Sequence, residues 1–210
     1  KDITHIGGSI LSSSRGPQDV KVMVDYLELL KIDILFCVGG DGTMRAAEKI
    51  ATEIHSRKKQ IAVIGIPKTI DNDLNLIEKS FGFDTAIAKT VEAVGSAHVE
   101  AKGAYNGIGL VKIMGRLSGY ITATAALAQG DANFVLIPEV PFELDGEKGF
   151  LKTLENRLKA SGHAVILVAE GAGQELMKQD GQEKKTDPSG NVRLHDIGLF
   201  LKNAIDVYFH

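Results

Sequence analysis

Short apolar runs alternate with helical patterns along most of this chain, and that alternation restricts the fold more than any other feature. The runs predict strands at residues 4–7, 34–38, 61–66, 108–113, 134–137 and 164–169. The runs at 34–38 and 61–66 are almost entirely apolar, which is typical of parallel strands buried on both faces. The sequence therefore predicts strands that lie inside a sheet covered by helices.

The segments between these runs carry apolar residues at helical spacing. They predict helices at residues 20–30, 43–54, 85–99, 117–128, 149–160 and 196–209. Strands separated by helices of this length indicate βαβ units and a parallel sheet. Because a fresh series begins near Asp84, we expect two lobes, 1–84 and 85–210. The predicted fold class is α/β, with two doubly wound parallel-sheet lobes and an active-site cleft between them.

Charge and cysteine content exclude several classes of protein. The chain has 24 Lys and Arg against 27 Asp and Glu, a net charge of −3, so we expect neither nucleic acid nor a membrane surface as partner. The apolar runs are too short to span a bilayer. The single cysteine, Cys37, excludes a disulfide framework and a cysteine-based metal site, and it fits a cytoplasmic protein.

A glycine-rich loop, GGDGT, follows the predicted strand 34–38 and precedes a helix. Glycines let the backbone approach an anion closely, and the helix N-terminus adds free N–H groups. A carboxylate in such a cradle repels phosphate unless a cation lies between them, so Asp41 is a candidate Mg²⁺ ligand. The alternative is a tight turn in which Asp41 caps the helix.

The loop PKTIDND follows the strand 61–66 and carries two carboxylates, Asp71 and Asp73, two residues apart. One can accept a proton from a hydroxyl nucleophile while the other holds a metal ion. Lys68 supplies positive charge where phosphoryl charge accumulates. The alternative is a surface turn rich in Asp and Asn.

Two further strand ends carry charged residues. After strand 108–113, Gly115 permits close backbone approach and Arg116 offers a bidentate fork for phosphate, unless Arg116 simply faces solvent. After strand 164–169, Glu170 suits sugar hydroxyls, although a helix-capping role is equally compatible with the sequence. Arg15 could also lie over a phosphate, but an isolated Arg before Pro is more often a surface residue.

These loops together resemble the 6-phosphofructokinase family, in particular its long-chain branch, which includes the plant-type ATP enzymes. The matching stretches are GGDGT at 39–43, PKTIDND at 67–73, FGFDTA at 81–86, MGRLSG at 114–119, IPE at 137–139 and VAEGAGQ at 168–174. GGDGT is shared with NAD kinases and lipid kinases of the same superfamily. PKTIDND followed by MGR and EG is highly specific.

The resemblance implies a role for each matching residue. Asp71 resembles the general base that takes the proton of the sugar 1-hydroxyl, with Lys68 and Arg116 offsetting charge. Asp41 and Asp73 resemble the acids that hold Mg²⁺. The sugar phosphate is implied to contact Thr69, Ile70, Asp71, Met114, Gly115, Arg116 and Glu170. The phosphoryl donor is implied to contact Arg15, Gly16, Gly40, Asp41, Gly42 and Thr43.

The implied reaction is Mg²⁺-dependent phosphoryl transfer from ATP to O1 of fructose 6-phosphate by a dimer or tetramer of identical chains. Pyrophosphate stays open as donor, because this chain combines Gly42, typical of ATP enzymes, with Lys68, typical of pyrophosphate enzymes. An NAD-kinase-like or lipid-kinase-like enzyme stays open as well, and so does a non-catalytic fragment or regulatory subunit. The chain lacks an initiator Met, the family's SGGDAPG-type loop and its C-terminal basic segment, so we expect an interior fragment.

Overall fold

The computed structural model describes residues 3–10, 12, 16, 18–177, 186 and 192–209. Along the chain its strands are β1 (Ile34–Gly39), β2 (Ala62–Thr69), β3 (Phe81–Gly82), β4 (Gly107–Ile113), β5 (Phe134–Leu136) and β6 (His163–Ala169). Its α-helices are α1 (Val20–Leu29), α2 (Asp41–Ser56), α3 (Phe83–Gly103), α4 (Tyr120–Gln129), α5 (Phe150–Ser161) and α6 (Ile197–Phe209). Two 3₁₀ turns, η1 (Ile3–His5) and η2 (Gln174–Met177), complete the described elements.

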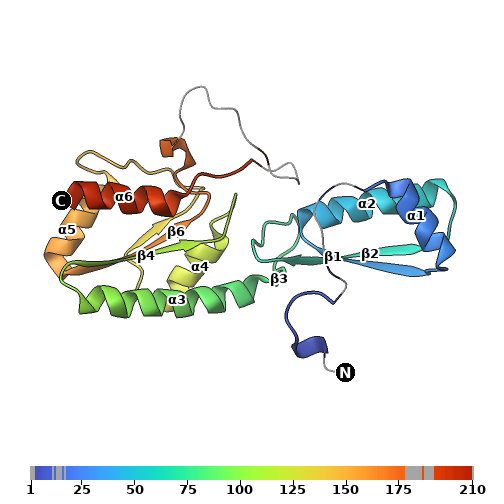
Figure 1. The fold of residues 1–210 in the computed structure, drawn as a ribbon, viewed down its shortest axis with the longest axis horizontal. Coiled ribbons are helices and arrows are strands. Elements are labelled where there is room, and N and C mark those ends of the chain that lie inside the picture. The colour runs from blue at the N-terminus through green and yellow to red at the C-terminus, as the bar shows by residue number, and fades with distance from the viewer. Residues whose placement is uncertain are drawn as a thin grey trace.

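The strands form two parallel sheets, and this confirms the α/β class with parallel sheets. In the first sheet the strand order is β1-β2-β3, and β1 pairs with β2 from Ile34↔Ala62 to Gly39↔Pro67. Helices α1 and α2 lie on the same side of β1 and β2 (Figure 1). A small core of Val24, Ile50 and Ile54 joins these helices to the sheet.

The expectation that strands 34–38 and 61–66 are buried on both faces is wrong for the part of the chain that the structure describes. Ile34, Phe36 and Val38 are 52%, 56% and 54% exposed, and Ile64 is 43% exposed. Side chains alternate between the two faces of a strand, and both helices cover the same face. Alternate residues of β1 and β2 therefore point away from the helices.

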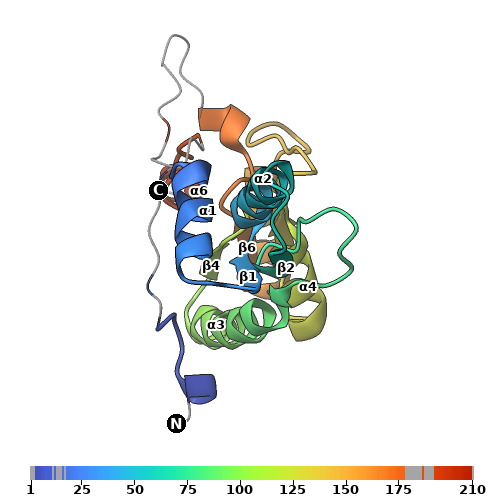
Figure 2. The same cartoon turned by 90° about the vertical axis from the view of Figure 1, so that its right-hand side faces the viewer.

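The predicted strand at 4–7 is also wrong. The chain forms the 3₁₀ turn η1 instead, with the N–H of Ile6 donating to the carbonyl of Ile3 at 3.2 Å. Figures 1 and 2 show this turn lying apart from both sheets. Without a neighbouring strand the segment has no ladder to join, so a local turn satisfies its backbone.

The second sheet has the order β4-β6-β5 and is covered on both faces. Helices α3 and α4 lie below it in Figure 1 and α6 lies above it, and side chains of α5 pack with those of α6 in one apolar cluster against β6. In the central strand β6, residues 164–169 are fully buried, as expected for a doubly wound sheet. Two clusters of apolar side chains, one on each face, form the core.

Two glycines let helix α3 lie directly on strand β4. A Cβ atom added at Gly107 would lie 2.1 Å from the carbonyl oxygen of Ala101, and one added at Gly109 would lie 2.8 Å from that of Ala97. Both distances are shorter than side chains tolerate against backbone. The close approach of α3 to β4 therefore depends on the absence of side chains at these two positions.

Among the described residues, no helix combines the length and the apolar character that a bilayer-spanning segment requires.

We predict that Gly107→Ala destabilises the natural full-length protein by about 1–3 kcal/mol, because its methyl group forces α3 away from β4. Gly103→Ala is the matched control, since a Cβ atom at that helical glycine meets nothing within 4 Å. The control should be neutral or stabilising by up to about 1 kcal/mol. Urea denaturation midpoints test both variants. Equal midpoints for the two variants would contradict the packing argument.

Candidate functional site

The loops that follow β2 and β4 meet between the two sheets. Ser118, in the loop after β4, donates a hydrogen bond from its hydroxyl to the backbone carbonyl of Asp71, in the loop after β2, at 3.3 Å. Asp71 also lies close enough to Asp73, Glu170 and Arg116 for their charges to act on it. The structure thus gathers residues from three strand ends around Asp71, as ligand sites of α/β sheets require.

Asp71 is half-buried and carries a perturbed carboxyl group. Burial raises its pKa, the negative charges of Asp73 and Glu170 raise it further, and the positive charge of Arg116 lowers it. A carboxylate with a raised pKa accepts a proton more readily than an ordinary Asp does. The environment of Asp71 therefore suits a general base.

The loop around Asp71 is fixed by hydrogen bonds among residues 69 to 80. The N–H of Asp71 donates to the hydroxyl of Thr69 at 3.2 Å. Asn72 adopts a left-handed conformation, φ 53°, and its side-chain oxygen accepts from the N–H of Ser80 at 2.7 Å. The buried hydroxyl of Ser80 donates in turn to the carbonyl of Thr69 at 2.8 Å. These bonds hold the backbone on both sides of Asp71.

The predicted loop at 67–73 is partly strand, because β2 continues through Thr69 and Lys68 pairs with Phe81 of β3. Lys68 is exposed and makes no ion pair within the described part of the chain. Ile70 packs against the apolar cluster that contains Phe83. Thr69 and Ile70 thus lie beside Asp71, while the structure gives Lys68 no partner in this group.

The loops after β4 and β6 cross in direct contact. The N–H of Glu170 donates to the carbonyl of Ile113 at 2.8 Å, and that of Gly171 donates to the carbonyl of Gly115 at 3.2 Å. A Cβ atom at Gly171 would lie 1.9 Å from the carbonyl oxygen of Arg116. Only glycine allows this crossing, which places Glu170 beside Arg116.

Arg116 carries a buried nitrogen that has no partner in the part of the chain that the structure describes. Its Nη1 atom is buried and forms no hydrogen bond with the described residues. A buried N–H group left unpaired is costly, and a phosphate group bound by the guanidinium would satisfy it. Met114 lies two residues before it and is 61% exposed. The carboxylate of Glu170 caps no helix, since the next element, η2, begins at Gln174.

The glycine-rich loop links β1 to α2. Helix α2 begins at Asp41, and its N-cap residue is Gly40, so Asp41 does not cap the helix. Asp41 instead forms an exposed ion pair with Arg45 at 3.0 Å. The side chain of Thr43 lies against the backbone of the loop. A Cβ atom added at Gly39 would be 2.2 Å from the Thr43 hydroxyl oxygen, so only glycine fits at position 39.

Asp41 and Asp73 line one cavity of about 320 Å³. Its other lining residues come from α2, β2 and the loop after β2: Met44, Gly65, Pro67, Leu74, Asn75 and Ile77. Within the described residues no group of three or more His, Cys, Asp or Glu side chains could hold a metal ion. Mg²⁺ is commonly bound by one or two carboxylates with waters and substrate phosphates, so this pair fits Mg²⁺ held together with a phosphoryl donor.

Two of the predicted donor residues, Gly16 and Gly42, have open space beside their Cα atoms. Arg15 lies outside the residues that the structure describes. Gly16 is exposed with a φ of 124°, and a Cβ atom there would meet nothing within 4 Å. Gly42 is similarly open. The space beside Gly42 is therefore free for a ligand.

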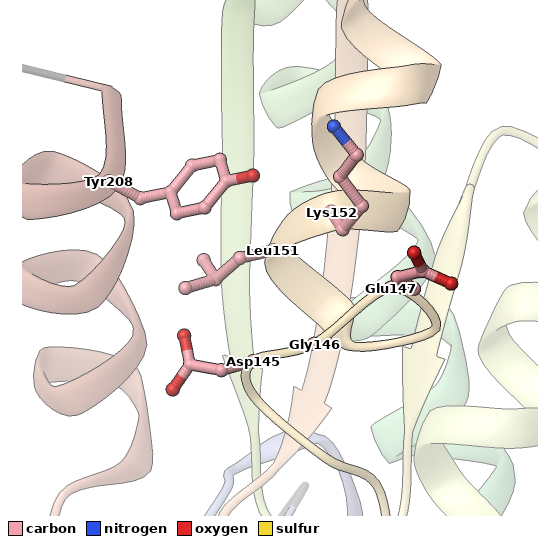
Figure 3. A pocket seen from close by; sticks show the side chains of 6 residues that line it. All are labelled: Asp145, Gly146, Glu147, Leu151, Lys152 and Tyr208. Carbon is pink, nitrogen blue, oxygen red and sulfur yellow. The ribbon is translucent and has the colours of Figure 1, made fainter.

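A second cavity, of about 280 Å³, lies between α5, α6 and the loop at 145–147 (Figure 3). The hydroxyl of Tyr208 at its edge donates to Glu155 at 3.2 Å, and Lys152 bonds the same carboxylate at 2.7 Å. These two hydrogen bonds engage Tyr208 and Lys152, and the carboxylates of Asp145 and Glu147 also line the cavity. None of the predicted site residues lines it.

The sequence does not single out the residues that hold the site together: Ser118, Glu139, Asn72 and Ser80. Glu139 accepts two bonds from the N–H of Gly119, at 2.8 and 3.1 Å, and so fixes the start of α4. The resemblance to a known family includes Ser118 and Glu139 but implies no role for either. The one signal in the sequence is the residue type of Asn72, because Asn tolerates a left-handed conformation better than most residues.

Known enzymes resemble this chain over almost its whole length. An ATP-dependent 6-phosphofructokinase from Borreliella burgdorferi is 52% identical over 99% of this chain and 47% of its own length. ATP-dependent 6-phosphofructokinase 7 of Arabidopsis thaliana is 50% identical over 99% of this chain and 43% of its own. The chain thus spans somewhat less than half the length of these curated relatives.

Solved structures and a family model agree with these relatives. A pyrophosphate-dependent phosphofructokinase from Marinobacter aquaeolei has a TM-score of 0.72 at 22% identity, covering 95% of this chain and 47% of that one. The phosphofructokinase of Pichia pastoris in the T-state has a TM-score of 0.72 at 21% identity, covering 100% of this chain and 22% of that one. At such identities these structures establish the fold alone. The model of the family described as Phosphofructokinase matches residues 1–205, and the chain therefore belongs to the phosphofructokinase family.

Proposed function

We propose that this chain carries the phosphoryl-transfer chemistry of an ATP-dependent 6-phosphofructokinase. The observation that carries the proposal is the half-buried Asp71, with its raised pKa, facing Arg116 and Glu170 from the second sheet. These residues would supply the groups that such a transfer uses: a base in Asp71, a guanidinium for phosphate in Arg116 and an acid for sugar hydroxyls in Glu170. The names of relatives about 50% identical support ATP as donor.

In the proposed reaction, Asp71 takes the proton from the 1-hydroxyl of fructose 6-phosphate. The resulting oxygen attacks the γ-phosphorus of ATP, and the bond from that phosphorus to the β,γ-bridging oxygen breaks. The products are fructose 1,6-bisphosphate and ADP, and the proton stays on Asp71 until solvent removes it. Arg116, and Lys68 at the end of β2, offset the negative charge that spreads over the transferring group.

Asp41 and Asp73 would hold Mg²⁺ at their common cavity. When bound, the ion would neutralise phosphate charge on the donor. The ion pair with Arg45 leaves Asp41 accessible, since the Asp41 side chain is 59% exposed. A carboxylate that is both exposed and next to a cavity can exchange one partner for another.

The remaining binding residues divide between the two lobes in this proposal. Residues 1–84 bind the donor through Arg15, Gly16, Gly40, Gly42 and Thr43. Residues 85–210 bind the sugar phosphate through Met114, Gly115, Arg116 and Glu170, together with Thr69 and Ile70 from the first lobe. A cytoplasmic dimer or tetramer is the proposed working form, and sedimentation of the full-length protein measures it.

Two different functions would need a different site. An NAD-kinase-like or lipid-kinase-like enzyme would need the glycine-rich loop without the cluster around Asp71, and a non-catalytic subunit would need neither. Neither of these functions needs the half-buried carboxylate of Asp71 beside Arg116. A coupled assay for fructose 1,6-bisphosphate on the natural full-length protein distinguishes the three functions.

We predict that Asp71→Asn lowers kcat in the full-length protein by about 10²–10⁴-fold, because it removes the general base. Binding of ATP should be unchanged. Asp33→Asn is the matched control, since Asp33 is an exposed carboxylate before β1 with no ion pair among the described residues. A kcat within threefold of wild type for Asp71→Asn would assign the base to another group.

The donor preference is predicted to depend on position 42. Wild type should have the higher kcat/KM with Mg-ATP than with Mg-pyrophosphate, because the open space at Gly42 admits a nucleotide. Gly42→Asp should lower kcat/KM for ATP at least about tenfold, since placing like charges together costs several kcal/mol. Gly42→Asn separates the effect of charge from that of size. A wild type that prefers pyrophosphate would refute this argument.

A further inference from the structure

Ser118 links the two loops that carry the proposed chemistry. It is 5% exposed, and its hydroxyl donates to the carbonyl of Asp71 at 3.3 Å while accepting from the N–H of Tyr120 at 3.2 Å. Among the described residues, this is the one side-chain hydrogen bond that joins the loop at 67–73 to the loop at 114–119. The other hydrogen bonds that hold Asp71 come from its own lobe.

The position of Ser118 is itself tightly fixed. A Cβ atom at Gly115 would lie 2.4 Å from the carbonyl oxygen of Ser118, so the turn closes on a glycine with a φ of 139°. On the other side, the N–H of Gly119 donates to both carboxylate oxygens of Glu139. The Ser118 hydroxyl is therefore a rigid donor, held from two directions, rather than a mobile surface group.

The same turn carries Arg116. A hydrogen bond from Ser118 to the backbone of Asp71 therefore sets the distance between the carboxylate of Asp71 and the guanidinium of Arg116. Proton transfer and phosphoryl transfer both depend steeply on such distances, since reacting groups displaced by about 1 Å lose much of their rate. The backbone bond leaves both oxygens of the Asp71 carboxylate free for the substrate.

We infer that Ser118 is a positioning residue. It holds the proposed base Asp71, which follows the first sheet, at a fixed distance from Arg116 and Glu170, which follow strands of the second sheet. The inference rests on the proposed function. It goes beyond the proposed function by assigning to a buried hydroxyl, bonded to the backbones of Asp71 and Tyr120, control over the rate of the transfer step.

The test compares Ser118→Ala with wild type in the natural full-length protein. Since a hydrogen bond contributes about 0.5–1.5 kcal/mol, kcat should fall about 2- to 13-fold. The KM for ATP should stay within about twofold, because Ser118 makes no hydrogen bond to the glycine-rich loop among the described residues. Ser96→Ala is the matched control, since the Ser96 hydroxyl also donates to a backbone carbonyl, that of Glu92 at 3.0 Å, on an exposed part of α3.

A double-mutant cycle separates positioning from general destabilisation. If Ser118 acts through Asp71, then adding Ser118→Ala to Asp71→Asn should change the residual kcat less than about twofold. The inference would be overturned if Ser118→Ala lowered kcat by the same factor in the wild-type and Asp71→Asn proteins. An undiminished kcat for Ser118→Ala alone would overturn it as well. If Ser118→Ala does not fold, as judged by circular dichroism, Ser118→Cys keeps the volume with a weaker donor and is measured in the same cycle.

The proposed function and this inference fail in different ways. A wild-type protein that does not phosphorylate fructose 6-phosphate overturns the proposed function and the inference with it. An active wild type whose Ser118→Ala variant is equally active overturns the inference alone.

Discussion

The contact between the backbones of Gly171 and Arg116 is the constraint on which the site depends. The Gly171 N–H donates to the Gly115 carbonyl at 3.2 Å, and a Cβ atom at Gly171 would lie 1.9 Å from the Arg116 carbonyl oxygen. No side chain fits between the two loops, so they pass at backbone distance. This places Glu170 next to Arg116 and turns the loop after β4 toward the loop that carries Asp71.

The electrostatics of the site follow from that arrangement. The negative charges of Asp73 and Glu170 raise the pKa of Asp71, and the positive charge of Arg116 offsets part of that effect. Its Nη1 atom is buried without a partner among the described residues. Such an arrangement of charge is unfavourable for a resting protein. In the proposed reaction, a phosphate would satisfy the guanidinium and a hydroxyl proton would reach Asp71, and both changes would relieve it.

Much of the fold could be predicted from sequence, because apolar periodicity reports which residues a strand or helix buries. Strand β6 is predicted within one residue and is buried on both faces, since helices of its own lobe lie on each side. Strand β1 has the same apolar pattern, but Phe36 and Val38 are exposed, because both neighbouring helices cover one face. Apolar composition cannot report how many faces are covered, since that depends on the topology of the whole sheet.

The candidate site could be predicted only in part. Residues whose charge or flexibility is unusual after a strand, such as Asp71, Asp41 and Gly115, stand out in the sequence. Ser118 and Ser80 do not, because a serine that donates to a distant carbonyl looks the same in sequence as a surface serine. Their roles arise from contacts between segments far apart in the chain, which only the folded structure reveals.

If Asp71 is a base whose proton affinity is set by its neighbours, the pH dependence of kcat at saturating substrates should report it. A base must be ionised to act, so kcat should fall on the acid side with an apparent pKa above that of an ordinary Asp, about 3.9. Glu170→Gln removes one of the negative charges that raise the pKa of Asp71, so the acid limb should move to lower pH. Glu143→Gln makes the same change of charge at an exposed position and should leave the limb in place. An acid limb that stays unmoved in Glu170→Gln, or moves to higher pH, would contradict this role for Asp71.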